Sequence, residues 1–204
     1  MSARKGMCEL NIHYDIQRLQ VEVDKESKSL TQQWQNVMNI VTAEPCGEIA
    51  RARLAFNLVD YITSDDLPLR LLITRAPQAM AKIADEISVH KEHRVINNKK
   101  SGVVYSRSEQ MIPRTLNYNA QYTAQKIVEG QSHSLSSDNL LDCLNDGDIL
   151  TPLDGILFLG CKRIASNIAK LKKQHPNLNI TMERVEVSDS FTGTTRKMAS
   201  YRLV

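Results

Sequence analysis

The chain has 204 residues, of which 42% are hydrophobic and 24% charged, and its formal net charge is +3. This composition excludes a fully disordered chain, because the apolar side chains are numerous enough to build a core of normal size. It fits an enzyme as well as a binding module, and the small positive charge does not by itself indicate nucleic-acid binding. The local distribution of charge along the sequence must therefore distinguish between these classes of protein.

Cysteine spacing and hydropathy predict a soluble protein of the cytoplasm. The four cysteines lie far apart and form no Cys-x-x-Cys pair, so we expect neither a zinc knuckle nor a disulfide framework (Cys8, Cys46, Cys143, Cys161). The first eleven residues contain no apolar signal-peptide core, and no segment is long enough to span a membrane. We therefore expect no membrane partner.

Residues 15–42 contain neither proline nor glycine. Their apolar side chains recur at intervals of three and four, with one break near Ser27 (Ile16, Leu19, Val23, Leu30, Trp34, Val37, Val41). This spacing predicts a long amphipathic helix, whose apolar stripe could pair with a second subunit or fold back on its own chain. We expect the segment 1–43 to serve dimerisation, since a homodimer could read two half-sites one helical turn apart.

The next region, residues 44–130, is predicted to be a helical domain. Residues 77–91 favour a helix of mixed charge, and two short strands at 94–96 and 103–105 flank a basic turn. This hairpin would supply secondary DNA contacts (Arg94, Lys99, Lys100, Arg107). A further helix is predicted over 113–128, and the serine-rich segment 129–137 indicates a linker, with a domain boundary near Gly130.

Residues 136–204 predict three helices followed by a hairpin. Serines at 136 and 137 can cap a first helix over 139–144, and Thr151 followed by Pro152 is a strong start signal for a second helix over 152–159. Gly160 permits a tight turn before a third helix over 161–174, and alternating side chains indicate strands over 179–187 and 198–204. This order is typical of a winged helix-turn-helix domain.

The third helix and the loop between the last two strands are basic. We expect the outward face of this helix to enter the major groove of DNA, with Arg163 and Asn167 reading base edges, while the loop contacts the neighbouring backbone. The predicted DNA-binding residues are Lys162, Arg163, Ser166, Asn167, Lys170 and Lys173 on the helix, with Thr194, Thr195, Arg196 and Lys197 at the loop.

Three segments, 151–156, 160–173 and Tyr201-Arg202-Leu203, resemble the phage-type helix-turn-helix domains of bacterial mobile elements, over about a third of the chain. The resemblance implies a DNA-binding module in a bacterial protein rather than any one biological role. Gly155 stands where such domains more often carry alanine. On helix propensity alone, glycine here would weaken the second helix by somewhat under ~1 kcal/mol.

The upstream region repeats part of this pattern. Residues 58–62 are similar to 140–144, Pro68-Leu69 to Pro152-Leu153, and the helix containing Met80 to the one containing Ile164. Either the chain holds a second, degenerate winged helix, or two helix-rich segments align by chance at a few apolar positions.

No nucleophile, phosphate loop or metal cluster of a known enzyme class is present in the sequence. His90 and His93 lie three residues apart without further ligands nearby, which is more typical of a solvated surface than of a zinc site. Asp65 and Asp66 fit a helix cap better than a nuclease site. We therefore expect a protein without enzymatic activity, cofactor or metal.

The predicted fold is mainly α with small β-hairpins, built from a winged helix-turn-helix in one or two tandem copies and a long N-terminal helix. The predicted function is a sequence-specific, double-stranded DNA-binding regulator of transcription in a phage, plasmid or other mobile element. A plasmid or phage replication initiator is the first alternative. The second is a protein-interaction module that inhibits or adapts a host machine through its basic faces.

Overall fold

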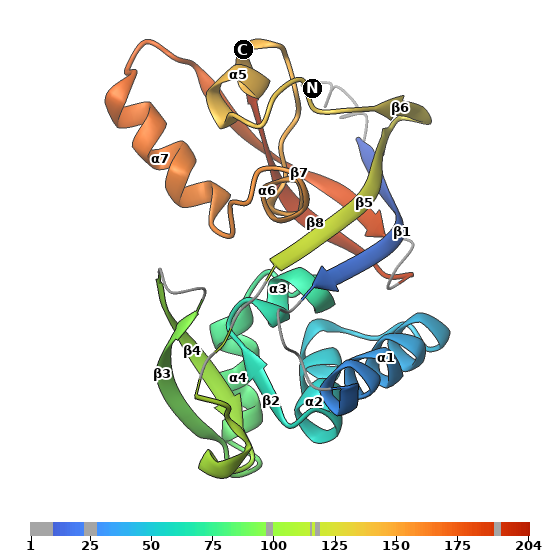
Figure 1. Cartoon of the computed structure of the whole chain (residues 1–204). Helices are drawn as coiled ribbons and strands as arrows, with labels where there is room; N and C mark the ends of the chain where they lie inside the picture. The colour runs from blue at the N-terminus through green and yellow to red at the C-terminus, as the bar shows by residue number, and fades with distance from the viewer. Residues whose placement is uncertain (1–9, 23–27, 97–99, 115, 117–118, 190–192) are drawn as a thin grey trace, which may run out of the picture.

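The computed structural model describes residues 10–22, 28–96, 100–114, 116, 119–189 and 193–204, which form two halves (Figure 1). The first half, below in Figure 1, contains α1 (Lys28–Ala43), α2 (Glu48–Leu58), β2 (Tyr61–Thr63), α3 (Asp66–Leu71), α4 (Ala76–Ala84), β3 (His90–Ile96), β4 (Lys100–Ser106) and the 3-10 helix η1 (Glu109–Met111). The second half contains β1 (Asn11–Glu22), β5 (Asn119–Val128), β6 (Gln131–His133), α5 (Leu140–Asn145), α6 (Pro152–Leu157), α7 (Ile164–Gln174), β7 (Ile180–Asp189) and β8 (Thr195–Leu203).

Each half is built on a β-sheet. The first half has a three-stranded sheet in the order β2-β4-β3, and the second has a five-stranded mixed sheet in the order β6-β5-β1-β7-β8. In the larger sheet β1 pairs antiparallel with β5 and parallel with β7. The predicted mainly α fold with small hairpins is therefore wrong, and the chain has an α/β fold.

The long N-terminal helix predicted over residues 15–42 is also wrong. Residues 11–22 form β1, in which Ile12 and Tyr14 are buried while Asn11 is exposed and His13 is half-buried. That alternation has the two-residue period of a strand, and it begins upstream of the segment in which helical spacing was found. The helix α1 starts only at Lys28, and its apolar stripe packs into the core of its own half (Leu30, Trp34, Val37, Val41).

The helix predicted over residues 113–128 is a strand instead. Residues 119–128 form β5, which pairs with β1 along its length, from Ile12 opposite Val128 to Glu22 opposite Asn119. A partner strand about a hundred residues away decides this conformation, which local periodicity cannot reveal. Gly130 lies in the turn between β5 and β6, with a positive φ of 80°.

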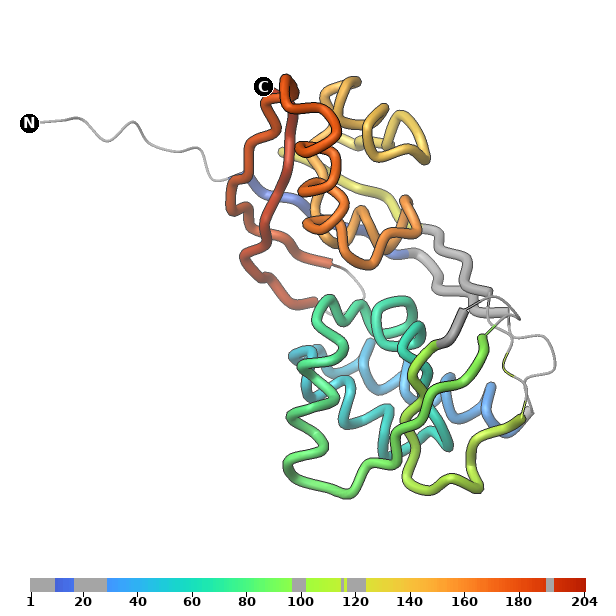
Figure 2. Tube along the Cα trace, turned by 90° about the vertical axis from the view of Figure 1, so that its left-hand side faces the viewer, coloured from blue at the N-terminus to red at the C-terminus, as the bar shows by residue number. Residues whose placement is uncertain are grey.

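The predicted helices of the C-terminal region are present as α5, α6 and α7, and the two predicted hairpins as β3-β4 and β7-β8. Figure 2 shows the two halves from the side, with the segments 28–96 and 140–203 in separate halves. Leu72 joins them, because it follows α3 in the first half but its side chain is buried among Leu153, Leu157 and Met198 of the second half.

An internal repeat relates the two halves, with an offset of 88 residues over the helices from α2 to α4 and a larger offset at the last strand of the hairpin. Each contains a helix, a short strand, two helices and an antiparallel hairpin: α2, β2, α3, α4 and β3-β4 in the first, and α5, Leu150, α6, α7 and β7-β8 in the second. Equivalent buried pairs are Ala55 and Cys143, Phe56 and Leu144, Ile62 and Leu150, Met80 and Ile168. The sequence comparison had placed Met80 against Ile164, so its register was wrong by one helical turn.

The repeat extends to the start of the second helix of each unit. The Thr63 hydroxyl accepts hydrogen bonds from the Asp65 and Asp66 amides, and the Thr63 amide donates to the Asp66 carboxylate over 2.7 Å. In the second unit Thr151 and Asp154 make the same reciprocal cap, again with a 2.7 Å bond from the Thr151 amide. Such caps satisfy amides that a helix start leaves without partners.

Each capping aspartate is buried and paired with a buried cation. The Arg70 Nε atom lies 2.8 Å from Asp66 in the first half, and the arginine also lies over the ring of Trp34, 4.5 Å from its centre. In the second half the cation is Lys126 of β5, whose Nζ atom lies 2.9 Å from Asp154 and also donates to the Ile149 carbonyl. This lysine therefore ties the sheet to the start of α6.

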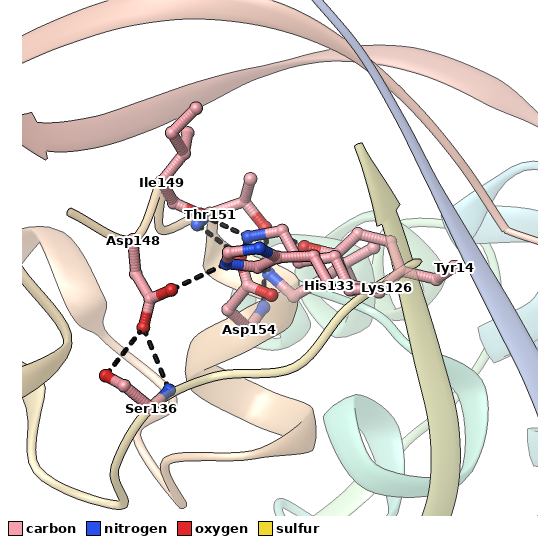
Figure 3. Close-up of polar contacts among 9 residues, drawn as sticks. Tyr14, Lys126, His133, Ser136, Asp148, Ile149, Thr151 and Asp154 are labelled. Carbon is pink, nitrogen blue, oxygen red and sulfur yellow. Dashed lines mark hydrogen bonds and ion pairs between the residues drawn. The ribbon is translucent and has the colours of Figure 1, made fainter. Parts of the chain in front are cut away.

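Figure 3 shows the contacts of Asp154 and Lys126 in the second half, together with another buried carboxylate, Asp148. Its Oδ1 atom lies 2.6 Å from His133 Nε2, and its Oδ2 atom accepts 3.1 Å bonds from the amide and the hydroxyl of Ser136. Burial alone would raise the pKa of Asp148, but these hydrogen bonds outweigh it and lower the pKa below its ordinary value. Asp148 thus fastens the segment after β6 to the segment before α6.

Replacing Lys126 by methionine should destabilise the protein by about 3–5 kcal/mol, because Asp154 would keep a buried charge without its counter-ion. Urea unfolding at neutral pH measures this change. The double variant Lys126→Met with Asp154→Asn should lose less, since a neutral amide can still accept from the Thr151 amide. Equal losses of stability in the single and double variants would contradict the explanation that the unpaired charge of Asp154 destabilises the protein.

Asp148→Asn should reduce stability at neutral pH, and the deficit relative to the wild type should shrink on acidification. The lowered pKa of Asp148 contributes stability that is fully present above its ordinary value of 3.8 and is lost as pH falls through the folded-state value. The midpoints of urea unfolding, measured between about pH 6 and about pH 3 where carboxylates titrate, test this prediction. A deficit that stays constant across that range would contradict it.

Candidate nucleic-acid interface

A groove of about 860 Å³ lies between the two halves. Its walls come from the start of α2 and the α3–α4 turn on one side, and from the start of α7 with β7 and β8 on the other. Among the described residues, seven cations and one carboxylate line it, namely Arg51, Arg75, Lys162, Arg163, Arg184, Arg196 and Lys197 with Glu48. The described lining is therefore strongly positive, although the net charge of the whole chain is only +3.

Two of the cations occupy equivalent positions in the repeat. Arg75 precedes α4 and Arg163 precedes α7, 88 residues apart, and their backbone angles agree closely, with φ and ψ of −120° and 53° against −133° and 63°. Both side chains belong to exposed residues, and both residues line the groove. The amino ends of α4 and α7 therefore meet the same groove, and each adds the positive end of a helix dipole.

Two ion pairs cross from one half to the other at the groove. Lys162 pairs with Asp65, and Arg196 of β8 pairs with Glu48 at the start of α2. Glu48 Oε1 also accepts a 3.1 Å bond from the Thr74 amide and a 2.9 Å bond from the Thr74 hydroxyl. A single carboxylate oxygen is thus held by three donors from both halves.

Arg51 lies at the floor of the groove and is 1% exposed. Its guanidinium donates to the backbone carbonyls of Leu71, over 2.9 Å, and of Cys46. Burial, and next the charge of Arg196, lower the pKa of Arg51, while Asp189 and Glu48 act in the opposite direction. An additional anion near these two arginines would favour their charged forms.

Most of the predicted DNA-binding residues line this groove, but the third helix contributes only its first turn. Lys162, Arg163 and Ser166 line it from α7 and the preceding turn, and the residues Thr194, Thr195, Arg196 and Lys197 line it from β8 and the residue before. Lys170 and Lys173 are exposed farther along α7 and are not among the lining residues. Asn167 is half-buried, also lies outside the lining, and its amide donates to Cys161 Sγ over 3.0 Å.

Among the predicted secondary contacts, the two with described side chains, Arg94 and Arg107, do not line the groove. Arg94 is half-buried and pairs with Glu92 at 2.6 Å, and Arg107 is exposed and donates to the Asn57 carbonyl over 2.9 Å. Lys99 lies outside the described residues, and of Lys100 only the backbone, at the start of β4, is described. Of the two predicted contacts whose side chains the structure describes, Arg94 and Arg107, neither joins the residues of α7 in lining the groove.

Three lining cations were missed in the sequence, Arg51, Arg75 and Arg184. Arg75 could have been found, because the repeat in its true register places it opposite Arg163. Arg51 is buried in α2 and Arg184 lies exposed in the middle of β7. No local pattern marks either of them, since the packing of the halves brings Arg51 to the groove and the pairing of β7 with β8 brings Arg184 there.

Within the described ranges, no three residues among His, Cys, Asp and Glu are placed to share a metal ion. His90 lies 3.8 Å from Glu92, and both residues lie on β3 and outside the lining of the groove.

None of the helices in the part of the chain that the structure describes is long and apolar enough to cross a bilayer. Comparisons with protein-family models, with curated proteins and with solved structures found no match.

Gly155 in α6 is in close contact with the turn that precedes α7. A Cβ atom added at this position would lie 2.6 Å from the Cys161 carbonyl oxygen, and the Gly155 carbonyl accepts a 2.6 Å bond from the Cys161 amide. The turn between the helices therefore needs a residue without a side chain here. Helix propensity alone predicts that glycine weakens α6 relative to alanine, but it does not take this close contact into account.

Gly155→Ala should accordingly destabilise the protein by about 1–3 kcal/mol, since backbone must shift to make room. Gly47→Ala is the matched control, because a Cβ atom there meets nothing within 4 Å and φ is −67°. Urea unfolding of both variants measures the difference. A Gly155→Ala protein as stable as the wild type, or more so, would show that propensity outweighs the close contact.

Proposed function

We propose that this protein is a sequence-specific, double-stranded DNA-binding regulator of transcription from a bacterial mobile element, and that DNA lies against the groove between its halves. The observation that carries the proposal is the basic lining of that groove, in which seven cations face a single carboxylate. A duplex presents a regular array of phosphates, and neutralising them releases condensed counter-ions. A concave surface of this charge suits such a polyanion better than it suits an ordinary protein surface.

We expect side chains at the first turns of α4 and α7 to recognise the bases of the DNA. Arg75 and Arg163 immediately precede these helices, and the exposed residues Gln78 and Ser166 follow at equivalent places three residues later. Arginine can pair with guanine and glutamine with adenine through two hydrogen bonds each in the major groove. The two helices carry different side chains, so the proposed DNA site has two unlike halves.

A replication initiator is the second candidate, and the internal repeat favours it. Two reading units on one chain allow a long site to be bound, which suits repeated sites at an origin. The homodimer expected from the sequence remains a prediction, and its original basis is weaker because the apolar stripe of α1 is buried within its own half. A location in the bacterial cytoplasm, where DNA is available, belongs to the same proposal.

The proposal predicts that the purified protein enriches a defined site from a random duplex library at near-physiological salt. Arg75→Ala and Arg163→Ala should each weaken binding to that site about tenfold, the loss of one good base contact. Lys91→Ala, which removes an exposed charge on β3 outside the groove, should change affinity little. Fluorescence anisotropy with the selected duplex measures all three.

Salt-sensitive binding without any enriched site would contradict the regulator and the initiator alike. Equal losses from Lys91→Ala and Arg163→Ala would show that charge acts without regard to position, so that the groove is not the interface. Retained binding of an acidic protein, with no DNA binding, would favour the protein-interaction alternative.

A further inference from the structure

The floor of the groove contains donors that lack acceptors. Among the described residues, Arg51 Nη2 and Arg196 Nε are buried nitrogen atoms without a hydrogen-bond partner. Both residues line the groove, and both are largely buried. Buried donors without acceptors are costly, and charged ones especially so. These two atoms therefore mark a place where an anion would be held.

The contacts of Glu48 reveal the chemistry of that place. Its Oε1 atom accepts from the Thr74 amide, the Thr74 hydroxyl and the Arg196 guanidinium. A backbone amide, a hydroxyl and a guanidinium are the donors that proteins commonly offer to a phosphate group. The carboxylate has fewer oxygen atoms than a phosphate and leaves the two arginine nitrogens unsatisfied.

We propose that this floor is a phosphate subsite, in which a phosphate group displaces Glu48 and binds Thr74, Arg196 and Arg51. The subsite rests in part on the proposed function, because a phosphodiester of DNA is the nearest source of the ligand, although a free phosphate compound has the same chemistry. Thr74 and Arg51 belong to the first half and Arg196 to the second, so one phosphate contacts both halves at once. In the absence of the ligand, Glu48 occupies the subsite.

Glu48→Gln is the decisive variant, because a neutral amide can still accept from Thr74 but no longer competes as an anion. We expect it to bind the selected duplex about threefold more tightly or better, whereas loss of a purely structural contact would leave affinity equal or lower. Thr74→Val should weaken binding by a similar factor, and Thr74→Ser, which keeps the hydroxyl, should restore it. Lys91→Ala again serves as the control for a charge outside the groove.

Arg196→Gln adds an independent measurement. Removing one cation that neutralises a phosphate should reduce the slope of log affinity against log salt by about 0.9. The same slope as the wild type, together with unchanged DNA affinity in Glu48→Gln and Thr74→Val, would show that no phosphate of DNA occupies the subsite. Urea midpoints of all variants identify any that fail to fold, and Glu48→Gln is tested by a gain of affinity that misfolding cannot produce.

Calorimetric titration with inorganic pyrophosphate separates the two sources of phosphate. If Thr74→Val abolishes the binding of pyrophosphate but leaves the affinity for DNA unchanged, the subsite is assigned to a small phosphorylated ligand. If the wild type binds no DNA but binds pyrophosphate through Thr74, the proposed function fails and the subsite stands. If DNA binds but neither Glu48→Gln nor Thr74→Val alters the binding of DNA or pyrophosphate, the subsite fails and the proposed function stands.

Discussion

The buried ion pair between Lys126 and Asp154 is the interaction on which the second half depends. Asp154 caps α6 together with Thr151, and Lys126 brings in β5, which holds β1 in the sheet. The hydroxyl of Tyr14 on β1 lies 2.7 Å from the Thr151 hydroxyl, so both neighbouring strands reach the same cap. Burying two charges is costly, but the geometry fixes where α6 starts and hence, through the Gly155 contact, where α7 presents its first turn.

Local chemistry made the C-terminal helices predictable. Thr151 followed by Pro152 is a start signal that needs no tertiary partner, and it is observed as a full capping box. The strands β1 and β5 could not be predicted in the same way, because each is stabilised by the other across a long sequence separation. Of the three-and-four spacing over residues 15–42, the part from Leu30 is buried by α1, Ile16 and Leu19 belong to β1, and Val23 lies outside the described residues.

The same distinction applies to the candidate interface. Residues on the first turn of α7 and on β8 were recognised because they are basic neighbours in the sequence, whereas Arg51 reaches the groove through the packing of the halves and Arg184 through the pairing of β7 with β8. Asn167 shows the converse error, since helical spacing placed it outward while its amide bonds to Cys161. Charge runs in the sequence thus located one wall of the groove and left the other unseen.

Leu72 has a left-handed backbone, φ 51°, at the position where the second unit has Gly160, φ 58°. A leucine tolerates this strain because its side chain is buried in the other half, and α3 packs against its own equivalent, α6. Contact between equivalent elements is how two subunits meet across a twofold axis. One chain thus contains two units that a dimer would otherwise bring together, so occupancy of the proposed two-part DNA site would rise with the first power of protein concentration rather than the second.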